Sequence, residues 1–200
     1  MGSRTLRAEE DEAPSTAAEP AMATLAEAAA DAHPGRGSGR GNRERAADRI
    51  RALRRGRRLA LSALYEAEFG QRTATAALER LLAAEADART VHLARTIVDA
   101  VRRHRAEIDA RIEALAPQFP IVTQAPIDRA ILRGAVGEVL HSGTTPARVA
   151  IAEWVELART YSGDPLRRLL NGLLGRIADE IATDPSSPAV RPDEPTSNRR

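Results

Sequence analysis

The stretch RIRALRRGRRLALSALYEAEF, residues 49–69, changes halfway along from a crowd of arginines to an apolar helical pattern. Its apolar residues recur at close to the spacing of about 3.6 residues that marks one face of an α-helix. In its basic half, four arginines at i, i+3, i+4 and i+7 share one helix face and a fifth flanks them: Arg51, Arg54, Arg55 and Arg58, with Arg57 alongside. Gly56 is a candidate break between two helices, because glycine weakens a helix interior. The stretch predicts a dense cationic face joined to a helix that packs into a core.

The cationic face is a local feature of the chain. Residues 36–58 hold ten arginines and two acids, a net charge of +8, whereas the whole chain carries +2. Neighbouring guanidinium groups repel one another on an isolated helix. They become favourable against phosphates, through charge-assisted hydrogen bonds and the release of counterions. The pattern therefore favours a nucleic acid as the ligand over a solvated face or an acidic protein partner, and by itself it does not separate RNA from DNA.

Several kinds of chemistry are excluded by composition. The chain has no cysteine, and all 30 of its basic residues are arginine. Zinc fingers, thiol nucleophiles, a P-loop lysine and Schiff-base chemistry are therefore ruled out. The four histidines lie on separate segments, without an HxxxH or HExxH pair. We expect no metal site, no cofactor and no enzymatic activity.

Composition also divides the chain into three parts. Residues 1–43 form an acidic leader that ends in a Gly/Arg-rich linker, GRGSGRGN at 35–42, and they show no sustained apolar period. Residues 184–200 are rich in proline. Both ends are predicted to be disordered, because such segments cannot bury enough apolar surface to offset their ordering entropy. No apolar run approaches the roughly 18 residues that a membrane span needs, so we expect a cytoplasmic protein.

Between the two ends, residues 44–183 carry successive helical patterns. The apolar spacing predicts helices over 74–84, 93–115, 127–140, 147–161 and 166–181, after the helix or helices of the opening stretch. Thr73 and Thr145 are predicted N-caps, and Gly143 is expected just beyond a helix end. Period-2 alternation is not sustained anywhere, so the fold class is all-α, a compact bundle of about six to seven helices.

Glycines interrupt a leucine stripe in LLNGLLGRI, residues 169–177. Each glycine costs about 1 kcal/mol relative to alanine inside a helix. The interpretation we favour is the close approach of another backbone at Gly172 and Gly175, with a ligand-binding role as the alternative.

Four blocks in this order resemble one known family. They are RRGRRLALSALYEAEF, PIDRAILRGAVGEVLH, VAIAEWVELARTYSG and RRLLNGLLGRI. Together they resemble the bacterial transcription antitermination factor NusB, over about residues 51–181. The resemblance implies a helical fold of two small sub-bundles. It also implies binding to the boxA element of ribosomal RNA leader transcripts together with NusE, a ribosomal protein, in an antitermination complex with RNA polymerase.

The resemblance further implies roles for particular residues. The family's basic N-terminal helix contacts RNA, which assigns RNA binding to Arg54, Arg55 and Arg57. The region that the family turns toward NusE and RNA corresponds to Asp164, Arg168 and Leu169, the expected partner-binding residues.

The chain departs from the family pattern at several positions. Pro165 replaces an acid and Leu169 a phenylalanine, so NusE docking is less firmly implied than the fold. Trp154 stands at a usual alanine, and Gly137 replaces the aromatic residue common before the following glutamate.

Three other functions stay open from the sequence. The chain could be a stand-alone relative of the NusB-like N-terminal domain of ribosomal RNA cytosine methyltransferases. It could be a helical protein-interaction module whose arginines bind an acidic protein. Such a module could also form a homodimer. It could also compact DNA without sequence preference.

Overall fold

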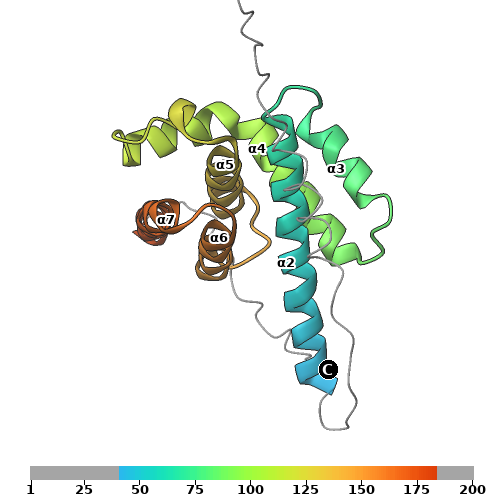
Figure 1. Ribbon diagram of the computed structural model, residues 1–200. Helices are drawn as coiled ribbons and strands as arrows, with labels where there is room; N and C mark the ends of the chain where they lie inside the picture. Colours follow the sequence, from blue (N-terminus) through green and yellow to red (C-terminus); the bar gives the residue numbers. More distant parts are fainter. Residues whose placement is uncertain (1–40, 184–200) are drawn as a thin grey trace, which may run out of the picture.

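The computed structural model describes residues 41–183, and these form helices joined by short connections (Figure 1). No strand occurs within this range, which confirms the all-α prediction. The predicted disorder of the leader and the tail lies outside the described residues, except for residues 41–43, which are helical. The elements are α2 (Gly41–Ala67), α3 (Ala74–Leu82), α4 (Ala88–Leu115), the short 3-10 helix η1 (Ile121–Thr123), α5 (Pro126–His141), α6 (Ala147–Tyr161) and α7 (Asp164–Thr183).

Helix α2 is continuous, so the candidate break at Gly56 was wrong. Gly56 is buried against α4, where a Cβ atom would stand 2.9 Å from the backbone oxygen of Thr90. The Thr90 hydroxyl donates a hydrogen bond of 3.1 Å to the backbone oxygen of Ala52, which lies one turn before Gly56. The glycine therefore lets two helix backbones approach closely, and its cost to helix propensity is offset by that packing.

The helices pack in two groups that share one core. Helix α2 packs against α3 and α4, while α6 packs against α5 and α7 (Figure 1). Helix α5 connects the groups, because it also contacts α2 and α4. The core is built from aliphatic side chains of every long helix, among them Leu61, Ile97, Ile131 and Leu170. No helix in residues 41–183 is both long enough and apolar enough to cross a lipid bilayer.

The unusual tryptophan of α6 is the largest side chain of this core. Trp154 is fully buried, and its ring lies over Gly134 of α5. A Cβ atom at Gly134 would stand only 2.5 Å from Cη2 of the indole. The indole Nε1 donates a hydrogen bond of 2.7 Å to Glu138. The large residue on one helix is thus accommodated by the absence of a side chain on the next.

The helix ends follow two of the three sequence predictions. Thr73 caps α3 by accepting a hydrogen bond from the Ala76 amide at 3.2 Å. Gly143 follows the end of α5 with a φ of 59°, in the left-handed region that favours glycine. The prediction for Thr145 was wrong, because α6 begins one residue later, with Pro146 at the N-cap position. The Thr145 hydroxyl instead accepts a hydrogen bond from Arg57.

Candidate nucleic-acid interface and partner groove

The arginines of the opening stretch come from the middle of α2, and most of them reach the surface. Arg51 and Arg54 are exposed, and Arg55 and Arg58 are half-buried. Arg51 pairs with Asp48 on its own helix, and Arg55 pairs with Glu85 after α3. Arg54 reaches Glu153 of α6, so neighbouring carboxylates partly balance the charge of these arginines. That the four side chains act as one RNA-binding face stays a prediction.

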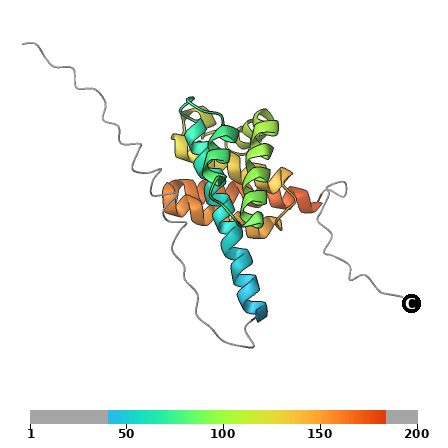
Figure 2. The same ribbon diagram turned by 90° about the vertical axis from the view of Figure 1, so that its right-hand side faces the viewer.

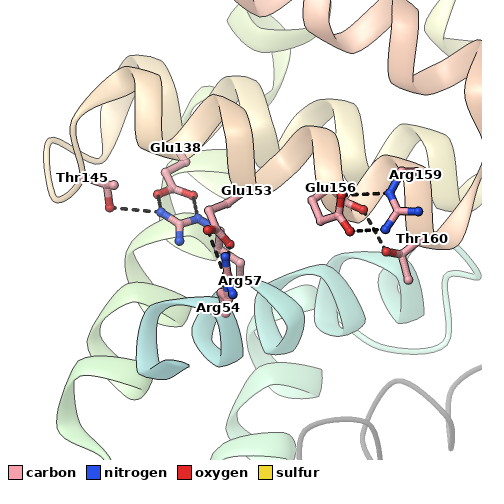
Figure 3. Close-up of polar contacts among 8 residues, drawn as sticks. All are labelled: Arg54, Arg57, Glu138, Thr145, Glu153, Glu156, Arg159 and Thr160. Atoms are coloured by element: carbon pink, nitrogen blue, oxygen red, sulfur yellow. Dashed lines mark hydrogen bonds and ion pairs between the residues drawn. The ribbon is translucent and has the colours of Figure 1, made fainter. Parts of the chain in front are cut away.

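Arg57 differs from the other four because it points into the protein. Its side chain is 1% exposed, and its guanidinium donates to both carboxylate oxygens of the buried Glu138, from Nε at 2.9 Å and from a terminal nitrogen at 2.6 Å (Figure 3). A third hydrogen bond of 3.2 Å goes to Thr145. The predicted position of Arg57 beside an exposed face is therefore corrected: it joins α2 to α5 and to the loop before α6.

A sequence signal for this burial existed. Arg57 lies at i, i+4 and i+7 with Leu61 and Leu64, which are both buried. The apolar stripe of the helix therefore continues through the arginine.

Arg54 marks the point where α2 meets α6. Its Nε donates to both oxygens of Glu153, at 3.1 and 2.9 Å (Figure 3). The hydrogen bond and the charge of Glu153 raise the pKa of Arg54. Beside this pair lies a hollow of about 420 Å³, whose lining includes Arg54, Arg58, Glu156 and Tyr161. Besides the buried Arg57, the lining therefore holds two guanidinium groups and two carboxylates, those of Glu153 and Glu156.

The basic surface extends further toward the N-terminus than the sequence analysis placed it. The first turns of α2 project beyond the rest of the bundle (Figure 2). They carry Arg43, Arg45 and Arg49, all exposed, and none of these forms an ion pair with another described residue. The sequence analysis counted them in the +8 segment but left them out of the RNA-binding face, because that face was drawn from the spacing of the arginines in residues 51–58. The run of helix-compatible residues after Gly41 is the signal that could have found them.

A second feature is a groove between α7, the end of α4 and the connector around η1. It has a volume of about 670 Å³. Of the predicted partner-binding residues, Arg168 and Leu169 line it, while Asp164 does not. Asp164 is exposed at the start of α7, where it accepts a hydrogen bond of 2.9 Å from Arg167. That bond lowers the pKa of the Asp164 carboxyl group.

One of the two glycines of the leucine stripe lies in the lining of this groove. Gly172 lines the groove, and a Cβ atom there would have no atom of another residue within 4 Å. The same open space surrounds Gly175. The interpretation that a backbone packs closely against these glycines was therefore wrong. Two further groove residues were missed by sequence reasoning: Phe119, which is 41% exposed, and Asp128, whose buried Oδ1 has no hydrogen-bond partner.

The fold and these surfaces define a class: an all-helical protein with an arginine-rich projecting helix and a separate, partly apolar groove. Comparison with known proteins gives the family. The family model described as NusB family matches residues 54–179, so the chain belongs to the NusB family. This result confirms the resemblance on which the residue assignments rest.

Curated relatives carry the name transcription antitermination protein NusB. The protein from Dehalococcoides mccartyi (strain CBDB1) is 33% identical over 130 residues, which are 64% of this chain and 91% of the relative. The protein from Myxococcus xanthus (strain DK1622) is 36% identical over 132 residues, covering 64% and 94%. The protein from Leifsonia xyli subsp. xyli (strain CTCB07) is 38% identical over 137 residues, covering 66% and 95%.

Solved structures agree on the fold. T. maritima NusB superimposes with a TM-score of 0.59 at 29% identity, over 64% of this chain and 91% of that chain. A chain from a complex of the antitermination factors NusB and NusE with double-stranded RNA gives a TM-score of 0.58 at 21% identity, over 66% and 98%. At that identity the second likeness speaks for the fold alone.

Proposed function

We propose that the protein is a transcription antitermination factor that binds boxA-type ribosomal RNA leader sequence together with NusE and joins RNA polymerase to suppress termination. It acts as a non-catalytic adaptor in the bacterial cytoplasm, where RNA polymerase works. The single observation that carries the proposal is the set of exposed arginines on the projecting helix α2 of this NusB-family protein. The name of the curated relatives supplies the process in which such a surface is used.

The proposed RNA surface consists of the accessible arginines of α2: Arg43, Arg45, Arg49, Arg51, Arg54, Arg55 and Arg58. Arg57 is left out, because breaking its buried pair with Glu138 would cost far more than a phosphate contact returns. The acids that already pair with Arg51, Arg54 and Arg55 are exchanged for phosphates when RNA binds. Such an exchange keeps each guanidinium charged and hydrogen-bonded in both states.

The proposed NusE-binding site is the groove lined by Arg168 and Leu169. Its lining combines apolar side chains, among them the exposed Phe119, with the charged Asp128, Arg168 and Arg176. The unpartnered Oδ1 of Asp128 is a buried acceptor that a donor from a partner could satisfy. Asp164 lies outside this groove. We propose that its carboxylate acts on the bound partner only electrostatically, as a surface charge near the groove.

RNA binding is tested by removing two charges at a time. We compare Arg51→Gln/Arg54→Gln with the matched control Arg102→Gln/Arg103→Gln, which removes two exposed arginines from α4. Fluorescence anisotropy with a boxA-like RNA and a scrambled RNA is measured over a range of salt concentrations. Each lost charge-assisted hydrogen bond is worth about 1.5–3 kcal/mol, so the α2 variant is expected to bind at least about tenfold more weakly. The slope of the logarithm of the binding constant against the logarithm of salt concentration should become shallower by roughly 0.7 for each lost phosphate contact.

The control variant should keep the affinity of the unmodified protein. Equal losses in both variants would mean that only net charge matters and would overturn the α2 assignment. Equal affinity for boxA and scrambled RNA, unmoved by NusE, would leave a NusB-fold protein without the antitermination role. A defined complex with protein alone would favour the interaction-module alternative.

Partner docking is tested separately at the two open glycines of α7. Gly172→Gln places a side chain in the groove, whereas the matched Gly175→Gln places the same side chain on the same helix outside it. Only the variant at position 172 should weaken NusE binding in a calorimetric titration. If both variants bind NusE equally well, the partner lies on another surface.

A further inference from the structure

Two histidines that are distant in sequence meet at the bend of α4. The rings of His104 and His141 stack with their centroids 3.8 Å apart and their planes 7° apart. Glu107 joins them: one carboxylate oxygen lies 3.1 Å from Nδ1 of His104, and the other lies 3.6 Å from Nε2 of His141. The sequence analysis treated the histidines as scattered, but the fold assembles two of them with a carboxylate.

The backbone at this place is adapted to the cluster. His104 has φ −114° and ψ 19°, which departs from helical geometry in the middle of α4. His141 is the last residue of α5. The bend of one helix thus meets the end of another, and the side chains that meet there carry nitrogen and oxygen donor atoms.

His141 is the more buried of the two histidines. Its Nε2 is buried and has no hydrogen-bond partner among residues 41–183, because the Glu107 oxygen at 3.6 Å lies beyond hydrogen-bond distance. An imidazole nitrogen that makes no hydrogen bond is a donor atom available to a metal ion.

We propose that His104, Glu107 and His141 form a binding site for a divalent first-row transition metal of the zinc type. One nitrogen from each imidazole and one carboxylate oxygen supply three ligands, and their donor atoms already lie within 4.8 Å of one another. Two imidazoles and one carboxylate are a ligand set that suits Zn²⁺ and Co²⁺. Water completes the coordination sphere.

Binding requires a small rearrangement that the exposure of the site permits. A metal lies in the plane of each imidazole that binds it, so two parallel rings cannot share one ion without a rotation. His104 is 38% exposed and Glu107 is 60% exposed, which leaves both free to turn. Donor atoms around tetrahedral zinc are about 3.3 Å apart, since Zn–N distances are about 2.0–2.1 Å. The metal would then link the bend of α4 to the end of α5.

The first test uses the unmodified full chain without a histidine tag. The four histidines should give four resolvable imidazole proton signals, assigned with single His→Gln variants. Addition of Zn²⁺ to the chelator-treated protein is expected to shift the signals of His104 and His141, with saturation at one equivalent. The signals of His33 and His92 are the internal control. Equal shifts of all four signals, or no shift, would overturn the proposal.

The second test measures affinity. Co²⁺ binding is followed by its visible absorption in the unmodified protein, in His104→Gln, His141→Gln and Glu107→Gln, and in the matched control His92→Gln, whose side chain is exposed on α4. The three cluster variants should bind at least about tenfold more weakly, and the control should be unchanged. Circular dichroism without metal checks that each variant is folded. Unchanged affinity in His104→Gln and His141→Gln would show that the metal binds elsewhere.

Discussion

Arg57 of α2 and Glu138 of α5 form a two-point ion pair that is almost completely removed from solvent, with exposures of 1% and 0% for the two side chains. The same carboxylate accepts a hydrogen bond from the indole N–H of Trp154. A single buried acid therefore ties α2, α5 and α6 together. The position of the basic surface of α2 relative to α6 depends on this pair.

The first prediction concerns the stability that depends on Arg57. Arg57→Ala would leave Glu138 buried without its cationic partner, which should lower the free energy of unfolding by about 3–5 kcal/mol. Arg54→Ala on the exposed side of the helix should change it by less than about 0.5 kcal/mol. Urea denaturation followed by circular dichroism measures both. The double variant Arg57→Met/Glu138→Gln should recover part of the loss, because no buried charge remains.

Because Arg57 is buried and stabilises the fold, a loss of RNA binding in an Arg57 variant would indicate unfolding and not a lost RNA contact. If Arg57→Ala proves as stable as Arg54→Ala, the buried pair does not hold the helices as described.

The second prediction concerns the acid that competes with RNA for Arg54. Glu153→Gln removes a carboxylate that accepts two hydrogen bonds from this arginine and would repel an approaching phosphate. RNA affinity should rise by about two- to tenfold at low salt, with a smaller gain at high salt because of screening. Anisotropy titrations at two salt concentrations measure it.

Glu79→Gln is the matched control for this experiment, because Glu79 pairs with Arg95 between α3 and α4, away from α2. It removes the same charge and should leave RNA affinity nearly unchanged. A similar gain in both variants would mean that the effect is one of net charge.

The third prediction concerns the contact between Gly134 and Trp154. Gly134→Ala should destabilise the protein by about 1–3 kcal/mol, because the added methyl group would collide with the indole. In a Trp154→Ala background the same substitution should be neutral or stabilising, since the space is then open and alanine favours a helix. Trp154→Ala alone should cost about 3–5 kcal/mol.

A double-mutant cycle of urea unfolding experiments tests this change of sign. If Gly134→Ala destabilises both backgrounds equally, the glycine is required for a reason other than the tryptophan.

The fourth prediction contrasts two helical glycines. Gly56→Ala should lower stability by about 1–3 kcal/mol, because its Cβ would press on the backbone of α4. Gly172→Ala should raise stability by about 0.5–1 kcal/mol, because its surroundings are open and alanine is the better helix former. Thermal and urea unfolding measure both. A loss at position 172 would indicate packing that the open surroundings do not provide.

Much of the fold could be predicted from local patterns. The apolar spacing located the helices of residues 44–183, and the end at Gly143 and the cap at Thr73 followed from residue type. These features depend on residues a few positions apart, whose relation is set by helix geometry. The same helix geometry underlies the spacing of Arg51, Arg54, Arg55 and Arg58, whose common role toward RNA stays a prediction.

The roles of the glycines could not be predicted in this way. Gly56 and Gly172 both weaken a helix locally, and the sequence alone does not show which of them packs against another helix. One permits contact with α4 and the other opens onto a groove. Which of these holds depends on what lies opposite each residue, and that is decided by the packing of other helices.

By itself, the sequence determined that this protein is a helical bundle with a cationic face on one helix. Only the tertiary structure decided that Arg57 belongs to the interior and that His104 and His141 belong together. Arg57 and its partner are 81 positions apart, and the two histidines come from different helices. Helix periodicity fixes the face on which a side chain lies, but the burial of a charge depends on whether a distant carboxylate arrives to compensate it.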